Sequence, residues 1–242
     1  MSPSPYKVLI TTSGTGSRLG ELTKDTNKAL VDIAGRPALS YVLDKYPDNV
    51  PIVITVGYLA QQVRNCVDTE YSDRPIEFVT VSPFEGPGSS LGYSMLQAEP
   101  KLQCPFVFHA CDTIVTDDIP EPTRNWAAGY AASAEEAFDA SQYRTHLLDG
   151  ERLARVNDKG AADFQAIHIG ITGVHDFKDF WRTLRDLYEQ DPNNSGLSDV
   201  HVIGQMLLQG SVFYGVGFSG WLDTGTITAL KRARQYAQEN KI

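Results

Sequence analysis

The chain has 242 residues, 42% of them hydrophobic and 21% charged, which is typical of a globular protein. Its 21 basic and 30 acidic residues give a net charge of −9, which argues against general nucleic-acid binding because phosphate backbones attract basic surfaces. No stretch holds the roughly eighteen unbroken apolar residues of a membrane helix, and the N-terminus lacks the layout of a secretory signal. We therefore expect a cytoplasmic protein that binds neither nucleic acid nor membrane.

Three cysteines, Cys66, Cys104 and Cys111, are an odd number without paired spacing. This pattern favours small buried side chains over a disulfide framework or a zinc site. His109 and Cys111 would point the same way on a strand, but two ligands without partners are weak evidence for a metal.

The first half of the chain alternates β-branched runs with segments of helical apolar spacing. In chain order we predict strand 6–12, helix 37–46, strand 51–58, a helix from Leu59, strand 75–81, a helix within 89–100, and strand 104–115 broken by Asp112. This alternation predicts a largely parallel sheet with right-handed crossovers.

The second half begins with a stretch, 117–163, whose mixed periodicity indicates short antiparallel strands and a mobile flap. Regular patterns then predict strand 164–174, helices over 176–190 and 197–210, strand 211–218 and helix 226–240. Within 176–190 the apolar side chains fall at helical spacing, which is typical of a core-facing stripe. They are Phe177, Phe180, Trp181, Leu184, Leu187 and Tyr188.

The stretch VLITTSGTGSRLG, residues 8–20, combines a strand with a glycine-rich loop, which is typical of three kinds of phosphate site. A Walker loop is excluded because Leu19 and Gly20 stand where Gly-Lys is required. A dinucleotide fingerprint needs a third glycine or alanine where the chain has Leu19, and Asp32 follows a polar loop rather than a second strand. The remaining candidate is a loop that holds a triphosphate through backbone N–H groups, with Arg18 and Lys28 covering its phosphates.

At these residues the chain resembles the nucleotidyltransferases that make NDP-sugars and related activated headgroups. Their signature is Gly-x-Gly-x-Arg-Leu, a Leu-Thr pair, Pro-Lys-x-Leu and Gly-x-Pro before a helix. The matching residues are Gly14, Gly16, Arg18, Leu19, Leu22, Thr23, Lys28, Leu30, Gly35 and Pro37. Asn27 stands where the family usually has proline, a change that bears on loop stiffness more than on chemistry.

The resemblance extends over roughly 7–230 and implies a three-layer α/β/α Rossmann-like fold with a mixed, mostly parallel sheet. It implies a single domain over 1–242, with a nucleotide-binding half at about 1–115 and an acceptor-binding half at about 116–242. The implied nucleotide-binding residues are Thr12, Ser13, Gly14, Thr15, Gly16, Ser17, Arg18, Lys28, Ser89, Ser90 and Asp112. The implied acceptor-binding residues are Lys159, His168 and Gly170, and the implied metal ligands are Asp112 and Asp223. Beside Lys159, Asp158 and Gly160 replace the family's more usual glutamate and proline.

The implied reaction joins a nucleoside triphosphate to a small phosphorylated acceptor, whose phosphate oxygen attacks the α-phosphorus and displaces pyrophosphate. The attacking phosphate is already ionised at pH 7, so no general base is required, and the barrier is one of charge and positioning. Carboxylates are ligands suited to Mg²⁺, and the resemblance implies that Arg18, Lys28 and Lys159 are the catalytic cations.

Several interpretations stay open at this point. Asp223 could cap the last helix instead of binding a metal, and Ser89 and Ser90 could form a plain turn instead of contacting the base or ribose. The acidic pairs Asp117/Asp118 and Glu135/Glu136 are expected at the surface rather than as paired catalytic carboxylates. The preferred product is an NDP-sugar for capsule or other surface glycan synthesis. The alternatives are a cytidylyltransferase acting on a non-sugar phosphate such as phosphocholine, a non-catalytic nucleotide-binding regulatory domain, and an NAD-dependent oxidoreductase. The chain is a possible homo-oligomer.

Overall fold

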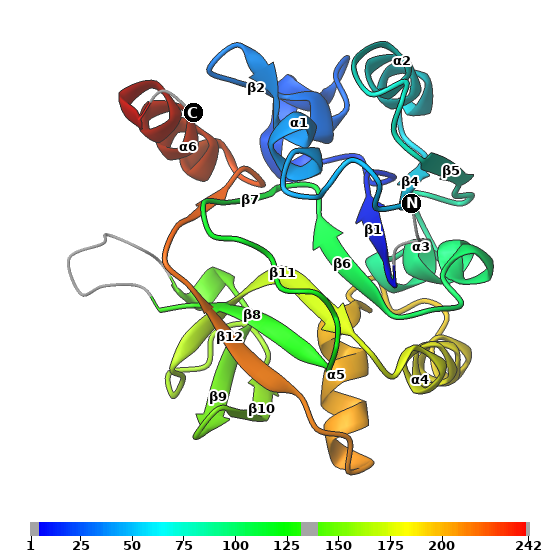
Figure 1. Cartoon of the computed structure of the whole chain (residues 1–242), viewed down its shortest axis with the longest axis vertical. Coiled ribbons are helices and arrows are strands. Elements are labelled where there is room, and N and C mark those ends of the chain that lie inside the picture. Colours follow the sequence, from blue (N-terminus) through cyan, green and yellow to red (C-terminus); the bar gives the residue numbers. More distant parts are fainter. Residues whose placement is uncertain (1–4, 132–139, 241–242) are drawn as a thin grey trace.

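The structure is a computed structural model that describes residues 5–131 and 140–240. Across these residues the chain forms a nine-stranded mixed sheet in the order β5-β4-β1-β6-β11-β8-β12-β10-β9 (Figure 1). The strands of its parallel half are β1 (Lys7–Thr11), β4 (Ile52–Val56), β5 (Ile76–Thr80) and β6 (Phe106–Ala110). The other half contains β8 (Trp126–Tyr130), β9 (Thr145–Asp149), β10 (Arg152–Asn157), β11 (Ala166–Val174) and β12 (Tyr214–Phe218).

Helices cover both faces of this sheet. One core contains side chains of α1 (Ala38–Leu43) and α2 (Ala60–Glu70) packed on the parallel strands. The opposite core contains side chains of α3 (Leu91–Ala98), α4 (Phe177–Gln190) and α5 (Asp199–Leu208). The last helix, α6 (Ile227–Asn240), packs through Leu230 and Ala233 on a third cluster near Leu19. The three-layer α/β/α fold with a mixed sheet is therefore confirmed.

The sheet changes direction at β11, which runs antiparallel to β6. β8 is antiparallel to β11 and parallel to β12, while β9 and β10 form an antiparallel pair at the far end. Short antiparallel pairing within 117–163 is thus confirmed for β9 and β10. The mobility of a flap there stays a prediction, and Glu135/Glu136 lie outside the described residues.

The predicted strand 104–115 is two strands, because the chain turns between β6 and β7 (Thr113–Val115). β7 leaves the large sheet and pairs antiparallel with β13 (Trp221–Asp223). Another small pair, β2 (Asp32–Ile33) with β3 (Arg36–Pro37), follows the short 3₁₀ segments η1 (Ser17–Thr23) and η2 (Lys28–Leu30). The remaining 3₁₀ turns are η3 (Glu99–Lys101) and η4 (Ala140–Gln142).

The aromatic stripe of α4 faces the core as predicted. Phe180, Trp181 and Leu184 are fully buried, and Trp181 stacks on Phe106 of β6 with ring centroids 4.9 Å apart. Full burial of a large apolar side chain contributes on the order of 2 kcal/mol to stability.

The cysteines are unpaired, but only Cys111 is buried; Cys66 and Cys104 are half-buried, so the expectation of three buried thiols was partly wrong. His109 and Cys111 give no support to a metal site. Both nitrogens of His109 are already bonded within the core, to the hydroxyl of Tyr46 at 2.8 Å and the carbonyl of Thr113 at 2.9 Å. Within the described ranges, no helix is long and apolar enough to cross a membrane.

Candidate functional site

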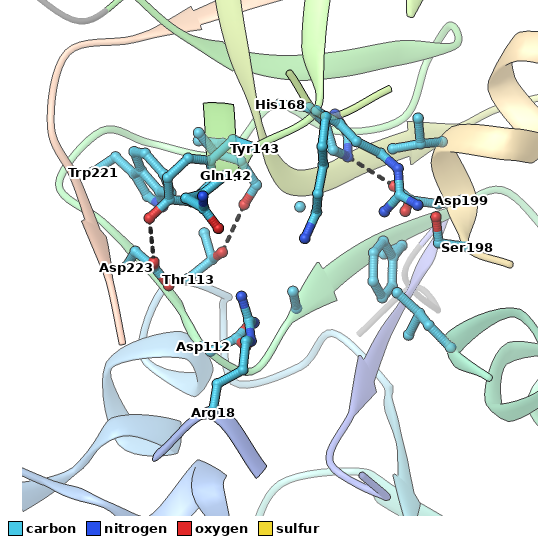
Figure 2. Close-up of a pocket in the computed structure, with 18 residues that line it drawn as sticks. Arg18, Asp112, Thr113, Gln142, Tyr143, His168, Ser198, Asp199, Trp221 and Asp223 are labelled. Atoms are coloured by element: carbon cyan, nitrogen blue, oxygen red, sulfur yellow. Dashed lines mark hydrogen bonds and ion pairs between the residues drawn. The ribbon is translucent and has the colours of Figure 1, made fainter. Parts of the chain in front are cut away.

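A first cavity, of about 550 Å³, opens at the carboxyl ends of the parallel strands. Its walls come from the glycine loop after β1, the 84–91 segment before α3, and the end of β6. A second cavity, of about 180 Å³, lies between β11, the start of α5 and β13 (Figure 2). Arg18, Leu91, Ala110 and Asp112 line both, so the two cavities meet at these residues.

Asp112 lies at this junction, in the turn that follows β6. The ammonium of Lys28 donates a hydrogen bond of 3.1 Å to its Oδ2, and a guanidinium nitrogen of Arg18 lies 3.9 Å from the same oxygen. Burial opposes ionisation of Asp112, but Lys28 and Arg18 outweigh it and hold the pKa of this carboxyl below its usual value. Burial likewise opposes the charge of Lys28, and Asp112 outweighs it and raises the pKa of the amine. Both groups are charged at pH 7.

Asp223 is brought beside Asp112 by the β7–β13 pair, in which it lies opposite Thr113. A side chain at Gly225 would come within 3.1 Å of Oδ2 of Asp112 and of Oδ1 of Asp223, so the two carboxylates border one small space. Burial raises the pKa of Asp223, and the like charge of Asp112 raises it further. Tyr143 donates a hydrogen bond of 2.6 Å to Asp223 (Figure 2).

The alternative role of Asp223, as a cap of the last helix, is wrong. The hydroxyl of Thr226 accepts the hydrogen bond from the amide of Ala229 at the start of α6, at 3.2 Å. Asp223 instead accepts the amide of Gly225 at 2.8 Å, within its own turn.

Two adjacent carboxylates in mutual repulsion are a donor set that a divalent cation would stabilise. Within residues 5–131 and 140–240 no group of three or more His, Cys, Asp or Glu side chains could enclose a metal by itself. Mg²⁺ commonly binds through one or two carboxylates and completes its coordination with phosphate oxygens and waters. Asp112 and Asp223 therefore fit Mg²⁺ that arrives with a phosphorylated substrate.

The glycine loop lies against Lys28. Gly16 has φ 69°, and a Cβ there would lie 2.8 Å from Cβ of Lys28, so the lysine can occupy its place only beside a glycine. Besides Arg18, four of the loop residues predicted to bind nucleotide line the first cavity. They are Ser13, Gly14, Thr15 and Ser17.

Other predicted nucleotide-binding residues have different placements. Thr12 is fully buried, and its hydroxyl donates to the carbonyl of Thr55 at 2.7 Å instead of lining the cavity. Ser89 and Ser90 do line it, although the hydroxyl of Ser89 donates to Gly86 and that of Ser90 caps α3 by accepting the amide of Tyr93 at 2.9 Å. Their turn and cap roles are thus present together with access to the cavity.

The second cavity gathers positive charge. Lys159, Arg144 and Arg18 all line it. Burial lowers the pKa of Lys159, and the like charges of Arg18 and Arg144 lower it further. Arg144 donates to the carbonyl of Gly196 at 3.3 Å, and its nearest carboxylate partner, Asp158 at 3.4 Å, is largely exposed. The closeness of these three cations favours a bound anion, although the carboxylates of Asp112, Asp199 and Asp223 line the same cavity.

A buried polar network that includes His168 and Asp199 lines the same cavity (Figure 2). It lies beside Arg144, whose backbone carbonyl accepts the amide of His168 at 2.9 Å. His168 donates from Nε2 to Asp199 at 3.0 Å, and the hydroxyl of Thr172 donates to the same oxygen at 2.9 Å. The other ring nitrogen of His168 shares a hydrogen bond of 2.9 Å with His146. Burial opposes the charge of Asp199, but His168 and Thr172 outweigh it and keep the pKa of its carboxyl below the usual value. Gly170 has φ 75°, and a Cβ at this position would lie 3.0 Å from the Cβ of Ala110. The glycine therefore lets β11 lie close to the end of β6.

Sequence reasoning missed Tyr143, Arg144 and Asp199. The first two fall in the stretch whose periodicity is mixed, where no motif singles them out. Asp199 follows Ser198 at a predicted helix start, a pattern that by itself indicates only a helix terminus.

Comparisons with known proteins match nucleotidyltransferases. The sequence model of the family described as MobA-like NTP transferase domain matches residues 8–156. The UTP–glucose-1-phosphate uridylyltransferase AglF of Haloferax volcanii is 24% identical over 96% of this chain and 97% of its own length. The bifunctional protein GlmU of Methanococcus vannielii is also 24% identical, over 96% of this chain and 55% of its own length.

Solved structures share the fold. A UDP-glucose pyrophosphorylase complexed with UDP-glucose has a TM-score of 0.78 and 16% identity, covering 98% of this chain and 100% of its own. The CTP:phosphocholine cytidylyltransferase of Streptococcus pneumoniae has a TM-score of 0.73 and 16% identity, covering 95% and 98% of the two chains.

Proposed function

Because the chain belongs to the MobA-like NTP transferase family and is a nucleotidyltransferase of the NDP-sugar pyrophosphorylase type, we propose that it transfers a nucleotidyl group from a nucleoside triphosphate to a sugar phosphate, with Mg²⁺ bound and pyrophosphate released. The whole chain acts as one domain, whose first 115 or so residues bind the nucleotide and whose remainder binds the acceptor.

The observation that carries this proposal is the meeting of the two cavities at Arg18 and Asp112. A triphosphate in the first cavity and a phosphorylated acceptor in the second would bring their phosphates together at this junction. Attack of one phosphate on another requires this approach of two polyanions, and holding them in line removes much of the barrier.

The first cavity is lined by groups of two kinds, which orient the nucleotide. Arg18 and Lys28 are its cations and hold the phosphates, while the 84–90 segment contributes the ring of Phe84 and the side chain of Ser89. The base and ribose therefore contact the 84–90 segment. Arg18 donates bidentate hydrogen bonds to the departing β- and γ-phosphates, and Lys28 stabilises the negative charge that develops during the transfer.

The acceptor phosphate binds to Lys159 and Arg144 in the second cavity. These cations cost free energy by repelling each other and Arg18, and a bound phosphate removes that cost. His168 and Gly170 face the remainder of the acceptor. Ser198 and Asp199 add hydrogen-bonding groups on the same wall, a set suited to the hydroxyls of a sugar.

Asp112 and Asp223 would hold Mg²⁺, which would supply positive charge to offset the negative charge of the phosphates. The protein's own part is to keep Asp112 ionised through Lys28 and to orient Asp223 through the hydroxyl of Tyr143.

A second candidate acceptor is an alcohol phosphate with a quaternary ammonium, such as phosphocholine. The rings of Tyr143 and Trp221 pack edge to face, 5.2 Å apart, beside the carboxylate of Asp223 in the second cavity. Aromatic faces with a nearby carboxylate suit such a cation. The polar network of His168 and Asp199 favours the sugar phosphate. The resemblance to capsule-associated enzymes supports a product used in capsule or other surface glycan synthesis.

The test is a matrix of the four ribonucleoside triphosphates and dTTP against sugar phosphates and alcohol phosphates, read by pyrophosphate release with Mg²⁺ and with EDTA. We expect Mg²⁺-dependent release with at least one sugar phosphate. Release only with phosphocholine would favour the second candidate, and release in EDTA at the same rate would contradict the metal assignment.

A further inference from the structure

Asn27 stands directly before Lys28, at the position where the family usually has proline, and it is fully buried. Its side-chain amide donates to the carbonyl of Thr12 at 3.1 Å and to that of Tyr58 at 2.7 Å. Its side-chain oxygen accepts the amide of Ala29 at 2.9 Å. Both amide hydrogens and the oxygen are therefore used, which a fully buried carboxamide requires.

These bonds join three separate segments. Thr12 follows β1, Tyr58 follows β4, and Ala29 lies in η2, the turn that contains Lys28. The backbone amide of Asn27 adds a fourth bond, of 3.0 Å, to the side chain of Gln62 in α2. We propose that Asn27 is a positioning residue for Lys28, fixing by hydrogen bonds the backbone that a proline would otherwise stiffen.

The ammonium of Lys28 has little freedom once this backbone is fixed. Its Nζ is bonded to Asp112, and its Cβ lies against Gly16, closely enough to exclude any side chain there. A shift of η2 would therefore move the ammonium away from the junction of the two cavities. Misplacement of a catalytic group by about 1 Å costs as much as a hundredfold in rate.

The backbone conformation of Asn27 is compatible with either asparagine or proline. Its φ of −60° and ψ of 139° are values that proline adopts without strain. A proline would keep this φ but would lose the bond to Gln62 and the three bonds of the side chain. Asn27→Pro therefore separates stiffness from hydrogen bonding, and Asn27→Ala removes the side-chain bonds while leaving φ free.

Asn125 provides a matched control, because it is a buried asparagine with a similar role far from both cavities. It donates to the carboxylate of Asp176 and accepts the amides of His175 and Asp176. Asn125→Ala should lower stability to a similar extent without moving Lys28, because its side-chain partners lie just before α4 and β12 and line neither cavity.

The kinetic test of this inference rests on the proposed function, because it requires turnover. We expect Asn27→Ala to lower kcat about 10- to 100-fold with little change in the KM for triphosphate. In a Lys28→Ala background the same substitution should change kcat by less than about twofold, since there is no ammonium left to misplace. Asn125→Ala should leave kcat within about twofold of wild type. Asn27→Pro should retain more activity than Asn27→Ala if stiffness contributes.

A second measurement does not depend on turnover. Acylation of Lys28 by an amine-reactive reagent, followed by mass spectrometry and normalised to the exposed Lys231, should rise several-fold in Asn27→Ala and stay unchanged in Asn125→Ala. Equal losses of kcat in both alanine variants, or an undiminished loss in the Lys28→Ala background, would overturn the proposal. If the wild-type protein turns over no substrate but Lys28 is acylated faster in Asn27→Ala than in wild type, the proposed function is contradicted and the positioning role is supported.

Discussion

The ammonium of Lys28 and the carboxylate of Asp112 meet at 3.1 Å although 84 residues separate them in the chain. The segment of Lys28 is bonded back to Thr12, just after β1, and Asp112 follows β6. β1 and β6 are neighbouring parallel strands, so their carboxyl ends open at the same edge of the sheet. Ligand sites in α/β sheets commonly form at this edge. The pair marks the place where donor and acceptor phosphates are proposed to meet.

The carboxylates of Asp112 and Asp223 should be needed for turnover more than for folding. Asp112→Asn and Asp223→Asn each remove one charge from the proposed Mg²⁺ site, and we expect kcat to fall by roughly two to three powers of ten. Pyrophosphate release measures the loss, with the exposed Asp32→Asn as the control. Activity retained in either active-site variant would remove that residue from the metal site.

Tyr143→Phe deletes the hydroxyl that orients Asp223 while keeping the ring against Trp221. Loss of a group that holds a metal ligand in place typically costs 10- to 100-fold in metal affinity or activity. We expect weaker binding of Mn²⁺, followed by electron paramagnetic resonance with nucleotide present. Tyr130→Phe, on a ring that also packs near Trp221, is the comparison. Equal Mn²⁺ affinities in the two variants would argue against an orienting role.

Arg144 and Lys159 should act on the acceptor rather than on the triphosphate. Arg144→Ala and Lys159→Ala each remove a charged hydrogen-bond donor, worth about 1.5 to 3 kcal/mol, so the KM for acceptor should rise roughly 10- to 100-fold. The KM for triphosphate should change little. Arg155→Ala, on the neighbouring strand β10, serves as control. An increase confined to the KM for triphosphate would show that these cations bind the triphosphate and not the acceptor.

His109 should make stability sensitive to acid. Burial lowers its pKa from 6.5 to about 4, and outweighs the hydrogen bond to the carbonyl of Thr113 and the charge of Asp112, which both raise it. The folded state therefore binds the proton less readily than the unfolded state, so stability is fully present above pH 6.5 and is lost as the pH falls toward 4. The shift corresponds to about 3 kcal/mol.

Urea unfolding at pH 7 and pH 5 measures this effect. His109→Gln should lower stability at pH 7 and reduce the further loss between the two pH values. His175→Gln, at the edge of the fold beside Pro122, should leave the difference as in wild type. A pH dependence unchanged by His109→Gln would assign the acid sensitivity to other groups, among them His146, whose pKa burial also lowers.

Outside 117–163, local patterns in the chain predicted the main strands and helices in order, because apolar periodicity reports which face of each element is buried. They also determined the glycine loop with Arg18, since strand, turn and charge are adjacent in sequence. They did not predict the small β2–β3 and β7–β13 pairs. Asp112 could be singled out as a carboxylate that interrupts an apolar run. The roles given to these residues came from the family resemblance and remain proposals.

Only the tertiary structure decided how the site is assembled. It turned Thr12 into the core, placed Asp223 beside Asp112 through the β7–β13 pair, and brought Tyr143 and Arg144 from a stretch without periodicity into the second cavity. It also gave Asn27 partners from three separate segments. Such contacts depend on strand pairing between residues distant in the chain, and a local pattern carries no information about which distant groups will satisfy a buried polar side chain.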